Sequence, residues 1–260
     1  MINEGKFLDY EQRDTTISMS QPAHNSLPIY QHNILIYMPI LANVFQRWTL
    51  PPERDFGWKM KSLESAKTSF TVENNGVFNL TIEHDLIRGV TPEMLYWWFC
   101  NIGGEMTYQG KTFSRYLVWH PKDHIHWSLA NKTKHDTVGV GSSFRIVEAF
   151  DRNMEYLVDS TEVVAKLDIT GIRLVRRIGT TEIFSLQHDF IPAGNDTQYK
   201  SQMIVGADKK PFNKIFNSYL RPLFFTSAMG YAWLQHNIEE VGNFEFFLPE
   251  LFEREANRHK

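Results

Sequence analysis

The chain has 260 residues, a formal net charge of -3 and a hydrophobic fraction of 42%. This is enough for one domain with a sizeable core, and the weak charge gives no basic field for nucleic acid. No apolar run reaches the ~20 residues that a membrane span needs, and the first residues lack a signal peptide's features. A single cysteine, Cys100, excludes an internal disulfide. The sequence predicts a soluble cytoplasmic protein that binds neither nucleic acid nor membranes.

Residues 1–50 are predicted to form an irregular N-terminal extension, and residues 51–260 the main domain, with Pro51-Pro52 at the boundary. The aromatic part of the extension could pack against a second subunit in a homodimer. A helix is expected to begin at Thr91-Pro92-Glu93, where Thr can cap the helix and Pro suits its first position. It should stop near Gly103-Gly104.

Most of the remaining chain reads as strands with period-two alternation, separated by polar turns. Beyond Pro211 the pattern becomes helical, with Pro222 and Pro249 as expected interruptions. The pattern predicts an α+β fold, in which a curved antiparallel sheet grips a long C-terminal helix and leaves a cavity between them. The expected strands are Trp58–Ser65, Thr68–Glu73, Val77–His84, Phe113–Trp119, Ser142–Phe150, Glu155–Leu167, Ile172–Ile178, Thr181–Ile191 and Tyr199–Val205.

Ionisable residues interrupt the apolar stripe of the C-terminal helix. His236 and Glu240 lie four residues apart, so they project from one face, one turn apart. Glu239 falls on another face and is expected to be solvated. The apolar members of the stripe are Met229, Ala232, Trp233 and Phe244.

Two predicted strands carry the same irregularity. Glu148 alternates in phase with Phe144, Ile146 and Phe150, and His188 is in phase with Phe184, Leu186 and Phe190. A buried carboxylate without a partner costs several kcal/mol or takes up a proton. A metal ion is a partner that satisfies several such groups at once.

A histidine-rich segment, Trp119–Trp127, contains His120, His124 and His126. One of these histidines would complete a site of two His and two Glu with Glu148, His236 and Glu240. Imidazole and carboxylate ligands suit zinc, and also iron(II) or manganese. His120 and His126 are expected at the surface or behind the ligands.

These segments resemble the diacetylphloroglucinol hydrolases and the related phloretin hydrolases, from about Pro51 to the C-terminus. The resemblance implies a helix-grip fold like that of the birch-pollen allergen and zinc held by two His and two Glu. The segments that carry it are Arg115-Tyr116, Trp119-His120-Pro121-Lys122-Asp123-His124, Phe144–Phe150, Tyr199-Lys200-Ser201, and His236 with Glu240. The implied ligands are His124, Glu148, His236 and Glu240, with Glu155 as a rival to Glu148.

The resemblance also assigns a substrate-binding or proton-transferring role to Tyr116, His188 and Tyr199. Trp127 departs from the family pattern, because it stands where the family has a polar asparagine, and this leaves the hydroxyl pattern of the substrate open. The implied activity is hydrolysis of the carbon–carbon bond between an acyl group and a phenolic ring.

Two other functions fit parts of the pattern. An iron-dependent dioxygenase could use His124-Ile125-His126 as ligands, although the glycine framework of a cupin barrel is absent and His236 lies on a predicted helix. A carrier of a hydrophobic ligand could use the same fold without catalysis. The ionisable residues on apolar faces argue against a carrier.

Overall fold

The computed structural model describes residues 48–131 and 138–256. The predicted N-terminal extension over residues 1–50 lies almost wholly outside these ranges, so its boundary at residue 51 stays a prediction. Among the described residues, no helix combines the length and the apolar character needed to cross a bilayer.

Eight strands form one antiparallel sheet in the order β1-β2-β10-β9-β8-β7-β6-β5. Two further strands, β3 (Glu105–Tyr108) and β4 (Lys111–Ser114), form a separate hairpin. The strands of the large sheet are β1 (Lys67–Val72), β2 (Phe78–Glu83), β5 (His124–Asn131), β6 (Ser143–Ala149), β7 (Leu157–Asp168), β8 (Gly171–Ile178), β9 (Thr181–Ala193) and β10 (Asp196–Val205).

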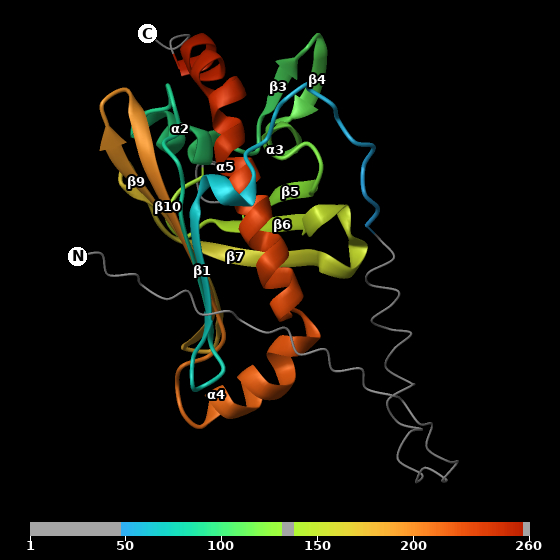
Figure 1. Cartoon of the computed structure of the whole chain (residues 1–260), viewed down its shortest axis with the longest axis vertical. Coiled ribbons are helices and arrows are strands. Elements are labelled where there is room, and N and C mark those ends of the chain that lie inside the picture. The colour runs from blue at the N-terminus through green and yellow to red at the C-terminus, as the bar shows by residue number, and fades with distance from the viewer. Residues whose placement is uncertain (1–47, 132–137, 257–260) are drawn as a thin grey trace, which may run out of the picture. The chain divides into compact units, whose positions relative to one another are not determined.

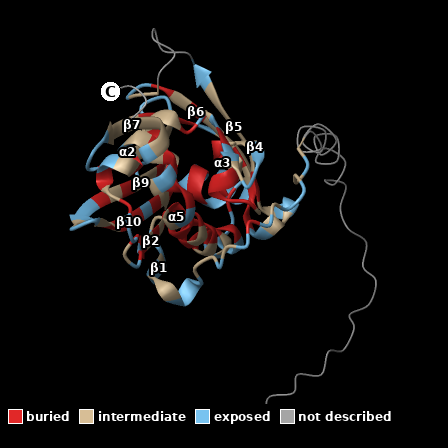
Figure 2. Ribbon diagram, turned by 90° about the horizontal axis from the view of Figure 1, so that it is seen from above, coloured by how far each residue is buried: buried red, intermediate tan, exposed pale blue. Residues whose placement is uncertain are grey.

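The sheet curves around one long helix, α5 (Ser227–Ala256) (Figure 1). Seen from above, the strands and the helices α2 (Pro92–Asn101) and α3 (Arg115–Trp119) are arranged around α5 (Figure 2). A four-residue helix, α4 (Phe212–Ile215), precedes it, followed by a π turn at Phe216–Leu220. The predicted α+β helix-grip fold is confirmed.

Local sequence explains how α5 and its neighbours pack. Thr91 caps α2 by accepting a hydrogen bond from the Met94 N–H at 3.5 Å.

The predicted stripe of α5 is buried: Trp233 and Phe244 are at most 3% exposed, and His236 and Glu240 share their environment. Burying aromatic area on both sides of these polar residues is what keeps them away from water.

Three sequence predictions were wrong. Residues 58–62 form no strand, and a 3-10 turn follows at Leu63–Ser65. The expected strand Phe113–Trp119 ends at Ser114 and continues as α3, because Tyr116 and Trp119 pack into the core from a helix despite their strand propensity. Pro249 does not interrupt α5, since Leu248 and Leu251 hold the helix on the core around it.

β5 was not among the expected strands, although it starts at the predicted ligand His124. The cavity expected between sheet and helix also stays a prediction. Hollows of about 410 and 420 Å³ lie elsewhere, one beside the β3–β4 hairpin and the end of α5, the other across β1, β2 and β10.

Candidate metal centre

The four predicted ligands come from three elements and lie together. His124 on β5 stands directly opposite Glu148 on β6 in the strand register, and α5 supplies His236 and Glu240 one turn apart. Nε2 of His124 is 3.5 Å from Glu148 Oε2 and 3.4 Å from Glu240 Oε2. Nε2 of His236 is 3.4 Å from Glu148 Oε2 and 3.7 Å from Glu240 Oε2. The two imidazole nitrogens and Glu148 lie within 4.8 Å of one another.

Each histidine is anchored through its other nitrogen. Nδ1 of His124 donates to the Tyr116 carbonyl at 2.6 Å, and Nδ1 of His236 donates to Asp123 Oδ2 at 2.9 Å. Both Nε2 atoms are buried without a hydrogen-bond partner among the described residues. A proton on Nδ1 leaves the lone pair on Nε2, which is how metal-binding histidines are held. When both rings are neutral, the two lone pairs point into the space between the two carboxylates, and a bound metal ion would replace the proton that these carboxylates favour on His236.

The electrostatics of the centre favour positive charge between the carboxylates. Burial raises the pKa of Glu240 to about 8, against the opposing influence of His236. Burial also lowers the pKa of His124 well below its ordinary value, and the nearby His236 adds to this effect. Burial opposes the charged form of His236 too, but Glu148 and Asp123 outweigh it and raise the pKa of this ring well above its usual range.

Other parts of the chain fix the two ligands on α5. Trp119 at the end of α3 donates from Nε1 to the Glu240 carbonyl at 2.9 Å, and Asn243 donates to the Trp119 carbonyl at 2.9 Å. Asn237 donates from Nδ2 to Glu240 Oε1. These contacts join α3, and hence the start of β5, to the middle of α5.

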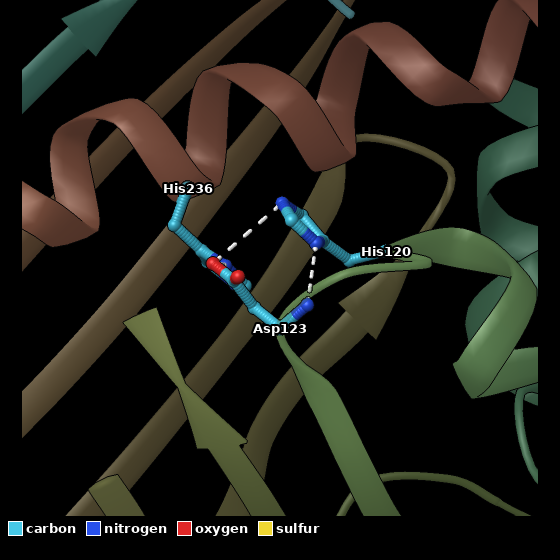
Figure 3. Close-up of side chains that lie close together, drawn as sticks. All are labelled: His120, Asp123 and His236. Carbon is cyan, nitrogen blue, oxygen red and sulfur yellow. Dashed lines mark hydrogen bonds and ion pairs between the residues drawn. The ribbon is translucent and has the colours of Figure 1, made fainter. Parts of the chain in front are cut away.

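A second polar cluster, His120, Asp123 and His236, lies beside the first (Figure 3). Its groups are occupied by hydrogen bonds. The Asp123 carboxylate accepts from His236 and from the backbone N–H groups of Asp151 and Arg152 at 3.0 and 3.1 Å. His120 Nδ1 accepts from the Asp123 N–H at 3.1 Å. We interpret this cluster as a support for His236, because both nitrogens of His120 and Nδ1 of His236 are already used in hydrogen bonds.

Asp123 also holds the turn that follows Glu148. Asp151 and Arg152 adopt left-handed backbone conformations, with φ of 55° and 52°. Two successive non-glycine residues in this region are strained, and the carboxylate accepts both of their N–H groups. Asp123 thus connects the turn at the end of β6 to the middle of α5. The segment that carries the resemblance includes Asp123, but no role was predicted for this residue, because it lies in a turn where buried and exposed side chains do not alternate.

His120 and Glu239 differ from their expected surroundings. His120 is fully buried, so the surface alternative is wrong for it, and its Nε2 donates to Glu239 Oε2 at 3.1 Å. Glu239 is therefore not simply solvated. His126, the third histidine of the segment, is half-buried and stacks on Trp48 with ring centroids 5.2 Å apart.

The residues predicted to contact a substrate lie near the centre. Tyr116 stacks on the His124 ring at 3.7 Å and donates from its hydroxyl to Glu148 Oε2 at 2.9 Å. Tyr199 is fully buried, and its hydroxyl has no hydrogen-bond partner among the described residues. It packs against His188 with ring centroids 5.1 Å apart. Burial raises the pKa of Tyr199 well above its ordinary value, with Glu240 adding to the effect.

The structure also shows the surroundings of Glu155 and Trp127, two positions whose roles the sequence left open. The rival ligand Glu155 is exposed on a 3-10 turn, whereas Glu148 faces the histidines. Trp127 packs on Phe144 at 5.0 Å and against Gly103, where a Cβ would lie 2.3 Å from the indole. Gly103 is therefore required by the tryptophan that departs from the family pattern.

Sequence reasoning missed Glu162, a third buried carboxylate. It lies on β7 opposite Phe144, and one oxygen accepts a hydrogen bond from Ser160 while the other has no partner among the described residues. Burial raises its pKa from 4.5 to about 7. The alternation that marks Glu148 also marks Glu162, because it is in phase with the buried Val164.

The buried carboxyl group of Glu162 leads to a prediction about how the free energy of unfolding depends on pH. Between pH 4.5 and 7 only the unfolded state releases the Glu162 proton, so the free energy of unfolding falls across this window by about 3 kcal/mol. We expect Glu162→Gln to remove this part of the pH dependence and to stabilise the metal-free protein above pH 7. Urea unfolding at pH 4.5 and 8 measures it, with the exposed Glu155→Gln as control. Equal pH dependence in Glu162→Gln and wild type would contradict the prediction.

Comparison with known families bears on the same region. Residues 60–167 match the family model described as DAPG hydrolase PhiG domain. The predicted resemblance is confirmed over this range. Tyr116, His124 and Glu148 lie inside the match, and His188, Tyr199, His236 and Glu240 lie beyond it. Comparison with the curated proteins gives no match.

Solved structures show distant likeness. The crystal structure of Ara h 8.0201 is 10% identical with a TM-score of 0.42, covering 66% of this chain and 97% of its own. The di-domain ARO/CYC BexL from the BE-7585A biosynthetic pathway is 9% identical with a TM-score of 0.42, covering 68% and 51%. The major latex-like protein 151 from Panax ginseng is 12% identical with a TM-score of 0.35, covering 62% and 97%. The helix-grip assignment follows from the strand order and α5 themselves.

Proposed function

We propose that this protein is a metal-dependent hydrolase that cleaves the carbon–carbon bond between an acyl group and a phenolic, phloroglucinol-like ring. The observation that carries the proposal is the pair of unpartnered Nε2 atoms of His124 and His236, which face Glu148 and Glu240. The match of residues 60–167 to the DAPG hydrolase domain supports the reaction class.

The nitrogen and oxygen donors suit zinc, with His124, Glu148 and His236 as the group whose ligand atoms all lie within 4.8 Å of one another and Glu240 as the fourth ligand at its side. Four ligands at about 2.1 Å from a tetrahedral zinc ion lie roughly 3.4 Å from one another. The nitrogen-to-oxygen distances between the histidines and the carboxylates range from 3.4 to 3.7 Å. The same nitrogen and oxygen ligands also suit iron(II) or manganese, so metal analysis has to decide among the three.

The reaction needs a proton on the ring carbon that bears the acyl group, water at the acyl carbonyl, and stabilisation of the negative charge on oxygen. When bound, a metal ion supplies Lewis acidity and an activated water near neutral pH. The protein supplies the remaining groups. The Tyr199 hydroxyl has an unused hydrogen bond and can hold a phenolic oxygen. His188 can accept a hydrogen bond from a phenolic hydroxyl, and Tyr116 fixes the orientation of Glu148.

Metal removal tests this function. Purified protein should contain one metal ion per chain and release a free acid and a phenol in equal amounts from acylated phenols. A strong chelator should abolish release, and zinc should restore it. The measurement is elemental analysis combined with chromatography of both products.

The same assay separates the alternatives. A dioxygenase would need oxygen, so hydrolysis that continues under anaerobic conditions excludes it. A carrier would bind acylphenols without releasing acid and without a stoichiometric metal. Full activity in metal-free protein would overturn the proposal.

A further inference from the structure

The inner face of the sheet carries a further buried carboxyl group beyond the metal centre. Glu162 on β7 lies directly opposite Phe144 on β6, four residues along that strand from the predicted ligand Glu148. Residues an even number apart point to the same face of a sheet, and four residues of strand span about 13 Å. Glu162 therefore shares the face of Glu148 but lies farther along it.

Arg176 on β8 continues this row of side chains. Val163 on β7 is paired with Val175 on β8. Their chain neighbours Glu162 and Arg176 therefore occupy adjacent positions on the opposite face, which is the inner one. The guanidinium carbon of Arg176 lies 5.8 Å from the ring centroid of Phe224, shortly before α5 begins.

Each of these two side chains has a buried polar atom that is not used. Glu162 is 3% exposed; one of its oxygens accepts from the Ser160 hydroxyl, and Oε2 has no partner among the described residues. Nε of Arg176 is also buried without a partner in the same part of the chain, so the two atoms do not bond to each other. Buried polar atoms are nearly always satisfied in proteins. Two unsatisfied ones at adjacent positions indicate that a further group binds here.

A hydroxyl group suits both atoms. It has one hydrogen to donate and can accept at its oxygen, so it can donate to Glu162 while it accepts from the Nε–H of Arg176. An apolar group would leave both atoms unsatisfied. Burial raises the pKa of Glu162 to about 7, and the Ser160 hydrogen bond and the charge of Arg176 oppose this only in part. A neutral carboxyl group also bonds to a hydroxyl, so the match holds in both protonation states.

We propose that Glu162 and Arg176 form a specificity subsite that binds a substrate hydroxyl lying away from the bond that is cleaved. The inference rests on the proposed function, in which the acyl carbonyl binds beside Glu148. The hydroxyl belongs to the phenolic ring, opposite the acyl group, or to the far end of the acyl chain, and the chemistry of recognition is the same. Both residues act through binding and take no part in the chemical step.

Two pairs of ligands, each differing by a single hydroxyl, test the subsite in metal-loaded protein. The first pair is monoacetylphloroglucinol and the dihydroxyacetophenone that lacks only the hydroxyl opposite the acetyl group. The second is a phloroglucinol acylated with a phenylpropanoyl chain, with and without a hydroxyl at the far end of that chain. Calorimetry measures the affinity for each ligand, and chromatography of the released acid gives kcat/KM. We expect wild type to prefer the hydroxylated member of one pair by about 10- to 100-fold, because its analogue leaves buried groups unsatisfied.

Substitutions then assign this preference to the two side chains. Glu162→Met, which has a similar length and no oxygen, should remove the preference by weakening the binding of the hydroxylated ligand alone. Glu162→Gln keeps an acceptor oxygen and should retain most of it. Arg176→Met should reduce it, whereas Arg177→Met, at the exposed next position of β8, should behave as wild type. A purely structural role would weaken both members of a pair equally.

The two pairs also identify the source of the hydroxyl. A preference that Glu162→Met removes in the first pair assigns it to the ring, and one removed in the second assigns it to the acyl chain. No preference in either pair in wild type, or an unchanged preference in Glu162→Met, would overturn the subsite. If wild type binds these ligands but releases no acid, the proposed function fails, and the affinities still decide the subsite.

Discussion

His124→Ala and Glu240→Ala should each lose the bound metal and lower turnover at least about 1,000-fold. The magnitude reflects the several kcal/mol of charge stabilisation that a catalytic metal supplies. Each change removes one predicted ligand atom. His124→Ala removes an unpartnered Nε2, and Glu240→Ala removes the carboxylate oxygen that lies 3.4 Å from this Nε2. Metal content and kcat/KM for an acylphenol, measured on the same preparation, check the prediction.

Stability separates loss of the site from loss of the fold. Burial raises the pKa of Glu240 to about 8, so this carboxyl group is costly to ionise in the metal-free protein. Metal-free Glu240→Ala should therefore unfold at no lower urea concentration than metal-free wild type at pH 8. Metal should stabilise wild type and leave the variant unchanged. Glu250→Gln, an exposed position on the same helix, should behave as wild type throughout. Retention of full metal content by either alanine variant would contradict the ligand assignment.

The sheet and the long helix were predictable because a buried face makes apolar residues recur at a regular spacing along a strand and along a helix. β6, β8 and β9 lie within about two residues of their expected positions, and the stripe through Trp233, His236 and Glu240 is buried as the spacing required. Tertiary packing overrode local propensity at α3 and at Pro249. Such packing depends on residues far along the chain, which no local window contains.

The candidate site was predictable only in part, for the same reason. Glu148, His188, His236 and Glu240 interrupt an apolar period, so their positions were visible in the sequence, whereas His124 was chosen among three histidines by resemblance. Strand pairing then places His124 opposite Glu148. Asp123 and Asn237 orient these ligands through contacts at a sequence separation of 113 residues and of three residues, respectively. Neither contact produces a pattern in the sequence.

Asp123→Asn should weaken metal binding by about 10- to 100-fold, the usual cost of losing the group behind a histidine ligand. The carboxylate accepts three hydrogen bonds, one from His236 Nδ1 and two from the strained turn at Asp151 and Arg152. An amide has only one oxygen, and its NH₂ group would face one of these donors. His236 would then lose its fixed tautomer, or the turn after Glu148 would open. Competition with a zinc chelator measures the affinity, and the exposed Asp85→Asn is the control.

Turnover at saturating zinc distinguishes a supporting role of Asp123 from a role as a metal ligand. Because Asp123 does not face the unpartnered nitrogens, saturating zinc should restore most of the turnover of Asp123→Asn, unlike that of His124→Ala. If Asp123 were itself a ligand in the cluster with His120, excess zinc would not restore activity. An unchanged zinc affinity would show that His236 needs no carboxylate behind it, and the tautomer of this ring would then have to be held by the packing of His120, whose ring centroid lies 4.4 Å away.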